Sequence, residues 1–186
     1  IVGGGSAGGV LANRLSHDPS NKVCLIEAGS PDDSLLVSTP GAFGAHMFWN
    51  KFNWFFTSQP DASSDHRGHL CPRGKGLGGS SSINGMVYTR GHSTDYDKWE
   101  ALGNKGWGFN DVLPLFKKSE DNENGADEHP GTGGLLPVTN AKNFFKLDDL
   151  VIEAAQQAGI TFNNYFNNTK LEGMCNYQIT NKANQS

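Results

Sequence analysis

A glycine-rich turn at the start of the chain constrains its fold more than any other feature. The opening letters IVGGGSAGG contain the pattern GxGxxG at Gly3, Gly5 and Gly8, and apolar residues at helical spacing follow it. Next comes VCLI at 23–26, a run typical of a short buried strand, which ends at Glu27. This order of turn, helix, strand and acidic residue predicts a βαβ unit of the type that binds dinucleotides.

Each glycine of the pattern has a physical role in such a unit. Gly3 permits the tight turn, Gly5 lets a pyrophosphate approach the backbone, and Gly8 lets the helix pack closely on the strand. The helix N-terminus offers unpaired N–H groups and a partial positive charge, and Glu27 is expected to accept hydrogen bonds from an adenosine ribose. A glycine-rich surface turn is the alternative interpretation, and the pattern does not separate NAD from FAD.

A second segment of this kind, RGKGLGGSSSINGMVYTRG, runs from Arg73 to Gly91. Its glycines and serines leave almost no side-chain bulk, so a flat or anionic group could lie against it. The serines at 80–82 are N-cap candidates for a short helix. A flexible linker is the alternative, but linkers do not normally continue into apolar residues such as Ile83 and Met86.

Composition favours small-molecule chemistry. Glycine accounts for 24 of 186 residues, roughly twice the average usage, so the backbone must turn sharply or approach something closely in many places. With 15 Lys and Arg against 19 Asp and Glu, the formal charge is -4, which gives no electrostatic case for binding nucleic acid or an anionic membrane. No apolar run is long enough to form a transmembrane segment.

Cysteines and histidines give no site of their own. The cysteines are widely spaced and odd in number, which argues against a disulfide framework or a metal site and mildly favours a reducing compartment. They are Cys24, Cys71 and Cys175. The histidines show no metal-ligand spacing and are interpreted as surface residues. They are His17, His46, His66, His69, His92 and His129.

A short helix is expected after the glycine-rich segments. Asn110 or Asp111 is its expected cap, with Val112, Leu115 and Phe116 facing inward.

Later in the chain, a helix at 147–158 is expected to start near Asp148 and end at Gly159, and a strand is expected at 177–180. The core face of that helix comprises Leu147, Leu150, Val151, Ala154 and Ala158.

Aromatic residues cluster between positions 48 and 56. They could wall a substrate pocket, but core packing is the favoured interpretation. They are Phe48, Trp49, Phe52, Trp54, Phe55 and Phe56.

The second glycine segment resembles the first signature of the glucose-methanol-choline (GMC) family of FAD-dependent oxidoreductases. The likeness rests on residues 74–84 followed by Tyr88, Gly91 and Asp97, and the opening glycines with EAG at 27–29 fit the FAD fingerprint of that family. Matching segments follow in order: DYDKW, GWG, DVLP and FKKSE. The chain is especially similar to the bacterial alcohol and choline dehydrogenases, although its HPGTGGL segment departs from the family pattern around His129.

The resemblance implies where FAD would bind. It places the pyrophosphate on Gly3, Gly5 and Gly8, the adenosine ribose on Glu27, and a further cofactor contact on Gly79. It also places the isoalloxazine ring beside four residues, Asn84, Gly85, Met86 and Val87. Ile83 stands where family members with covalently attached flavin have a histidine, so noncovalent FAD is expected.

The implied fold is α/β, with an incomplete Rossmann-like FAD-binding domain of the GMC type, inserted loop or lid segments, and the start of a substrate domain. The expected domains are 1–140, with its first strand truncated, and 141–186, the beginning of the substrate-binding region. The family's catalytic histidine pair lies near the C-terminus, and no histidine follows His129. We therefore expect an N-terminal fragment that carries FAD contacts and no catalytic residue.

The resemblance implies oxidation of a primary alcohol to an aldehyde by hydride transfer to flavin. The partners would be a small alcohol and an electron acceptor, either a quinone-type molecule or oxygen, with a dehydrogenase favoured. A lyase on the same fold, or a flavin-binding module without turnover, are the alternatives. Localisation stays open between the cytoplasm and the membrane periphery.

Overall fold

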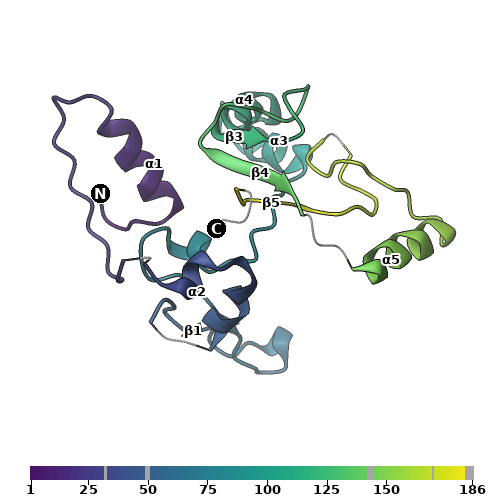
Figure 1. Cartoon of the computed structure of the whole chain (residues 1–186), viewed down its shortest axis with the longest axis horizontal. Helices are drawn as coiled ribbons and strands as arrows, with labels where there is room; N and C mark the ends of the chain where they lie inside the picture. Colours follow the sequence, from purple (N-terminus) through teal and green to yellow (C-terminus); the bar gives the residue numbers. More distant parts are fainter. Residues whose placement is uncertain (32, 49–50, 142–144, 169, 183–186) are drawn as a thin grey trace. The chain divides into compact units, whose positions relative to one another are not determined.

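The computed structural model describes residues 1–31, 33–48, 51–141, 145–168 and 170–182. These residues form two compact units, the first ending at Met86 and the second beginning at Val87. In Figure 1 the first runs from purple to teal and the second from teal to yellow. This division rests on packing alone, so the functional boundary expected at 140/141 stays a prediction. None of the described helices is both long and apolar enough to cross a membrane.

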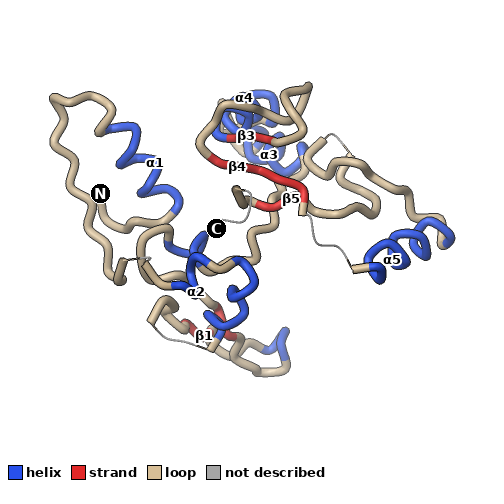
Figure 2. Tube along the Cα trace, viewed as in Figure 1, coloured by secondary structure: helices blue, strands red, loops and turns tan. Residues whose placement is uncertain are grey.

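The first unit consists of short elements around the two glycine-rich segments, with long loops between them (Figure 2). Its helices are α1 (Ser6–Leu15) and α2 (Leu35–Ser38), together with the 3₁₀ helices η1 (Pro40–Met47), η2 (Ala62–Ser64) and η3 (Gly79–Ser82). Its strands are β1 (Phe56–Thr57) and β2 (Leu70–Cys71), which pair antiparallel.

The predicted turn, helix and second extended segment are present in this unit. Val2 and Ile26 pair in parallel on either side of α1, and the Gly3 N–H donates to the Ile26 carbonyl at 2.8 Å. The Ile26 N–H donates in turn to the Ile1 carbonyl at 2.9 Å. Gly3 makes the turn with φ +90°, a left-handed conformation that favours glycine. The sequence therefore predicted the crossover correctly.

The segment at 23–26 is not the buried strand that its apolar letters predict. Ile26 is 59% exposed, and its pairing is a single bridge. Among the described residues only 1–3 pair with this segment, and a parallel strand becomes buried when its edges and faces are covered. Apolar side chains of α1 are exposed in the same way. They are Val10, Leu11 and Leu15.

The second unit combines helices with a small sheet. Its helices are α3 (Ser93–Ala101), α4 (Phe109–Ser119) and α5 (Lys146–Gln157), and its strands are β3 (Glu120–Asn122), β4 (Leu136–Asn140) and β5 (Gln178–Ile179). In the sheet, β4 lies between β3, to which it is parallel, and β5, to which it is antiparallel (Figure 2). Strand β5 falls within the strand predicted at 177–180, so that prediction is confirmed.

Helix α4 starts slightly earlier than predicted. Gly108 is its N-cap, and the predicted caps, Asn110 and Asp111, lie inside its first turn. Leu115, predicted to face inward, is 64% exposed. The other two predictions for this face are confirmed: Val112 is buried, and Phe116 packs against an aromatic ring of α3 with 5.7 Å between the ring centroids. Aromatic contacts rather than Leu115 therefore hold α4 against α3.

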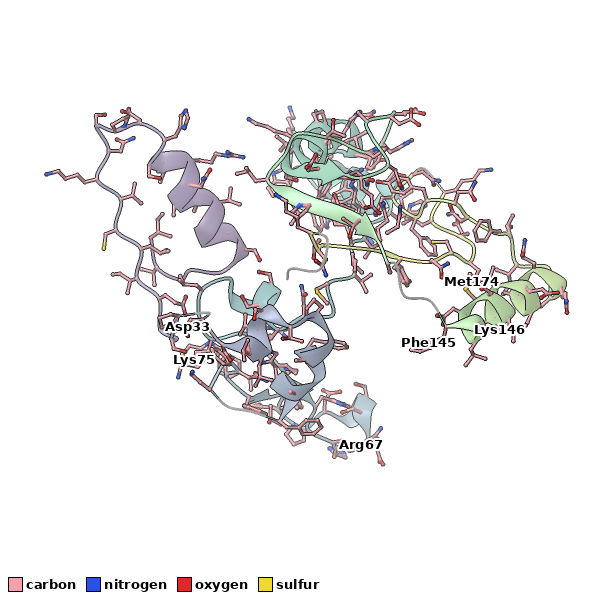
Figure 3. All side chains as sticks on the ribbon, in the orientation of Figure 1. Asp33, Arg67, Lys75, Phe145, Lys146 and Met174 are labelled. Carbon is pink, nitrogen blue, oxygen red and sulfur yellow. The ribbon has the colours of Figure 1, made fainter. Side chains whose placement is uncertain are left out.

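Helix α5 has the predicted length but buries the other side. The Asp148 carboxylate accepts from the Phe145 N–H at 2.8 Å where the helix begins (Figure 3 labels Phe145), and Gly159 follows its end with φ +85°. Ala155, outside the predicted core face, is buried. All residues of the predicted face are exposed, because no described element covers that side. They are Leu147, Leu150, Val151, Ala154 and Ala158.

A buried ion pair organises the second unit. Arg90 pairs with Glu120, whose side chain is fully buried, and the Tyr88 hydroxyl donates to the same carboxylate at 2.9 Å. Asn122 Nδ2 donates to the other carboxylate oxygen at 2.7 Å, and Arg90 Nη1 donates to the His129 carbonyl at 3.1 Å. Burial raises the pKa of Tyr88 to about 12, so this hydroxyl stays a donor. The network ties the segment before α3 to β3 and the following loop.

Candidate functional site

The two glycine-rich segments meet in the first unit. The Gly78 N–H donates to the Gly4 carbonyl at 2.8 Å, and Gly5 and Gly78 form a parallel bridge. A Cβ atom on Gly79 would lie 2.9 Å from the Gly5 Cα, and one on Gly29 would lie 2.3 Å from the Gly76 nitrogen. Side chains at Gly79 and Gly29 would therefore clash with the backbone that faces them, which explains glycine at these two positions.

A groove of about 750 Å³ opens where these segments meet. Five of the predicted cofactor residues line it, although they are spread from the start of the chain to η3. They are Gly3, Gly5, Gly8, Glu27 and Gly79. The groove thus gathers the residues to which the sequence assigned the pyrophosphate and the ribose.

The structure separates two kinds of glycine in the first motif. A Cβ atom on Gly8 would lie 1.9 Å from the Gly3 carbonyl oxygen, so the fold itself requires glycine at that position. At Gly5 the nearest atom to such a Cβ would be the Gly79 Cα, at an ordinary 3.8 Å. The protein leaves the space at Gly5 unfilled on the wall of the groove. This open cradle, next to the unpaired N–H groups that begin α1, fits a phosphate group.

Glu27 is held by the backbone of the glycine segments. Its Oε2 accepts from the Gly4 N–H at 2.7 Å and its Oε1 from the Gly29 N–H at 2.8 Å. The hydrogen bond from Gly4, and then that from Gly29, lower the pKa of Glu27, so the carboxylate is charged at neutral pH. The backbone N–H groups of Gly76 and Ala28 lower the pKa further, so the surrounding backbone favours the charged form.

Two aromatic residues form one wall of the groove; the sequence allowed a pocket wall for this cluster but favoured core packing. Trp54 and Phe56 line it, and their rings stack with centroids 5.8 Å apart and planes 5° apart. Lys75, labelled in Figure 3, places its Nζ 4.6 Å from the Trp54 ring centroid. Core packing, the favoured interpretation of the aromatic cluster, holds for the buried Phe52. Phe55, which lies between Trp54 and Phe56, has φ +53°, so the chain is not extended there and strand alternation does not account for the pair.

The remaining members of the aromatic cluster divide as follows. Phe48 is exposed, Phe55 is half-buried, and Trp49 lies outside the described residues.

The groove also contains a cation, Arg73, that the sequence did not assign to it. Its Nη1 donates to the Pro72 carbonyl at 2.7 Å.

The predicted isoalloxazine residues do not line this groove. Asn84 and Met86 line a separate cavity of about 230 Å³ in the same unit. A Cβ on Gly85 would approach the Phe43 ring at 3.9 Å, and Val87 is exposed and opens the second unit. Helix η3 contributes to both hollows, because its first half lines the groove and its second half lines the cavity.

The sequence predicted that the serines at 80–82 would cap a short helix, but they do not cap η3. Gly78, with φ +83°, is the N-cap, and the serine hydroxyls bond to nearby backbone instead. Ser81 donates to the Gly78 carbonyl and Ser82 to the Leu77 carbonyl, both at 2.7 Å. A left-handed turn that only glycine adopts easily therefore replaces the expected serine cap.

A parallel pairing across a helix, with a glycine-lined groove at the helix N-terminus, defines a nucleotide-binding α/β protein. The sequence model of the GMC oxidoreductase family matches residues 1–186. The chain belongs to the GMC oxidoreductase family, as its sequence motifs indicated.

Named relatives and a solved structure agree with this assignment. The chain is 45% identical over 186 residues to the alcohol dehydrogenase [acceptor] of Pseudomonas putida, covering 100% of this chain and 34% of that protein. It is 44% identical over 173 residues to the oxygen-dependent choline dehydrogenase of Sinorhizobium fredii, covering 93% of this chain and 32% of that protein. The crystal structure of pyridoxine 4-oxidase from Mesorbium loti matches with a TM-score of 0.93 at 34% identity, covering 100% of this chain and 36% of that one.

This likeness confirms the predicted fold class. The chain spans about a third of the length of the curated relatives it matches.

Proposed function

We propose that this chain forms the FAD-binding part of an oxidoreductase that converts a primary alcohol to an aldehyde. The observation that carries the proposal is the groove where the two glycine segments meet, with an open cradle at Gly5 and a charged carboxylate at Glu27. The relatives named as alcohol and choline dehydrogenases support the reaction class.

Within the groove, Gly3, Gly5 and Gly8 would hold the pyrophosphate at the N-terminus of α1. Glu27 would accept from the ribose hydroxyls, and Gly79 would contact the cofactor from η3. The isoalloxazine ring is assigned to the segment from Asn84 through Gly85 and Met86 to Val87. When bound, FAD supplies the acceptor for the hydride that leaves the alcohol carbon.

No residue of this chain is assigned as the catalytic base. Residues 1–140 are proposed as the FAD-binding domain and 141–186 as the beginning of the substrate-binding region. The electron acceptor is proposed to be a quinone-type molecule or oxygen, with a dehydrogenase favoured.

The test of this function is anaerobic flavin reduction by a primary alcohol. In the complete protein that contains this chain, the oxidised flavin absorbance should bleach, with one aldehyde formed per flavin. A flavin that stays oxidised with every alcohol tried would contradict the proposal and favour a lyase or a binding module.

We predict that FAD is held without a covalent bond, because Ile83 offers no nucleophile. Acid precipitation of the holoprotein should leave the yellow cofactor in the supernatant. Colour that remains in the pellet would show the prediction to be wrong.

We predict that Glu27→Ala weakens FAD binding about tenfold to a hundredfold, because charge-assisted hydrogen bonds are worth roughly 1.5 to 3 kcal/mol. Titration of the apoprotein with FAD measures the effect. Glu27→Gln keeps one acceptor oxygen and should lose less. An unchanged affinity for FAD in both variants would contradict the assignment of the ribose to Glu27.

The charge on Glu27 also predicts a pH dependence of stability. The pKa of Glu27 is lower in the folded protein, chiefly through the N–H of Gly4 and then of Gly29. Its stabilising effect is therefore present above the unfolded pKa of about 4.3 and is lost as pH falls through the lower folded value. In urea unfolding, the wild type should exceed Glu27→Gln in stability at pH 7, and the difference should shrink in acid. A difference that grows in acid would contradict this sign.

A further inference from the structure

The aromatic wall of the cofactor groove is only partly covered by protein. Trp54 and Phe56 line the groove together with the glycines and Glu27. Their side chains are 43% and 53% exposed, although their rings stack on each other. Aromatic rings carry a large apolar area, and burying that area is favourable. Two exposed rings that line one groove therefore form a surface on which an apolar, flat ligand group can pack.

Hydrogen bonds hold the backbone of this wall in place. The Trp54 N–H donates to the Arg73 carbonyl at 2.9 Å. The preceding residue, Asn53, is buried, and its Oδ1 accepts from the Phe55 N–H at 3.0 Å and from the Arg73 N–H at 3.1 Å. The wall is therefore anchored to Arg73, the first residue of the second glycine segment.

Phe55, between the two stacked rings, has a strained backbone. Its φ of +53° is left-handed, a conformation that is costly for a bulky residue. Strain of this kind persists where the surrounding structure fixes it, and it is often found at ligand clamps. Lys75 contacts the Trp54 ring through its Nζ but does not line the groove. The wall is thus fixed before any ligand binds, which lowers the entropic cost of binding.

FAD has two aromatic ring systems, and only one of them is available to this wall. The isoalloxazine ring is assigned to residues 84–87, none of which lines the groove. The ribose assigned to Glu27 carries the pyrophosphate at one end and the adenine at the other. Ala28, the residue after Glu27, also lines the groove. The assignment of the ribose therefore requires the adenine to lie close to Glu27, in the groove that contains the aromatic wall.

We propose that Trp54 and Phe56 form the adenine subsite of this groove, and that their contact with the base selects FAD over flavins that lack adenine. The inference rests on the proposed binding of FAD. A nucleotide base that packs on an aromatic side chain typically gains about tenfold or more in affinity. Such packing needs no hydrogen bond to the base, because every base has an apolar π-face.

The test is titration of the apoprotein, prepared from the complete protein that contains this chain, with FAD, ADP and FMN. ADP carries the adenine without the isoalloxazine, and FMN the reverse. The wild type should bind FAD more tightly than FMN and should bind ADP in competition with FAD. Trp54→Leu should raise the Kd of FAD and that of ADP by the same factor, about tenfold, and Trp54→Phe, which keeps a ring, should lose less. Phe48→Leu, at an exposed ring outside the groove, is the matched control and should leave both values unchanged.

A fall in FAD affinity without a change for ADP would assign Trp54 to the isoalloxazine and overturn the inference. Unchanged affinities for both ligands in Trp54→Leu would also overturn it, and so would a wild-type apoprotein that binds FMN as tightly as FAD. If Trp54→Leu does not fold, Phe56→Leu decides by the same comparison of FAD with ADP. An apoprotein that binds neither FAD nor ADP would instead contradict the proposed FAD-binding function itself, and this inference with it.

Discussion

Replacing Glu120 with alanine is expected to destabilise the protein by about 3 to 5 kcal/mol, because it leaves Arg90 as an uncompensated buried charge. Both side chains are almost fully shielded from solvent, and the Glu120 carboxylate also accepts from Tyr88 and Asn122. The loss should be local to the second unit. Hydrogen exchange at the Arg90 and Asn122 amides, together with urea unfolding of the complete protein, measures it.

Two matched variants distinguish the contribution of the ion pair to stability from that of the hydrogen bonds around it. Tyr88→Phe removes one hydrogen bond to the same carboxylate and should cost only about 1 kcal/mol. The double variant Arg90→Met with Glu120→Leu removes both charges and should recover much of the loss, because paired burial is often replaceable by apolar packing. If Glu120→Ala costs no more than Tyr88→Phe, the ion pair does not organise this unit.

This ion pair also explains part of what the sequence could predict. The family resemblance rested in part on Tyr88 and on the segment FKKSE, which are separated along the chain. The structure joins them, because the last residue of FKKSE is Glu120, the acceptor of both Tyr88 and Arg90. Motifs that match together were therefore two halves of one buried network.

Burial was harder to predict than the elements themselves. The sequence located α5 to within one residue at each end, yet its predicted core residues are exposed and Ala155 is buried. Periodicity reveals that a helix has an apolar face, but which face is covered depends on neighbours elsewhere in the chain.

The same limit applies to single side chains. His46, predicted at the surface, is only 2% exposed and contacts Leu36 and Phe52, and no helical or strand spacing indicates these contacts. Trp54 and Phe56 line the groove together with the glycine segments, and their spacing alone does not predict this because Phe55 between them has φ +53°.

Predicting the cofactor groove depended least on knowing which residues are neighbours in space, because a glycine pattern directly indicates close approach of the backbone.

Gly8→Ala is expected to have the largest effect on the cofactor groove. The added Cβ would lie 1.9 Å from the Gly3 carbonyl oxygen, so α1 or the turn must move. Overpacking of this kind typically costs about 1 to 3 kcal/mol, occasionally more, and the movement would displace the N–H groups to which we assign the pyrophosphate. Purified Gly8→Ala protein should contain almost no flavin and show a lower Tm.

Gly5→Ala is the control that separates folding from cofactor binding. In the structure its Cβ would meet nothing closer than the Gly79 Cα at 3.8 Å, so the apoprotein should keep its Tm. The methyl group would occupy the space assigned to the pyrophosphate, and FAD affinity should fall about a hundredfold, equivalent to roughly 2.7 kcal/mol. If the Gly5→Ala apoprotein binds FAD as well as the wild type does, the pyrophosphate does not bind at this turn. Stability lost at Gly8 and affinity lost at Gly5 would instead show that one glycine serves the fold and the other the ligand.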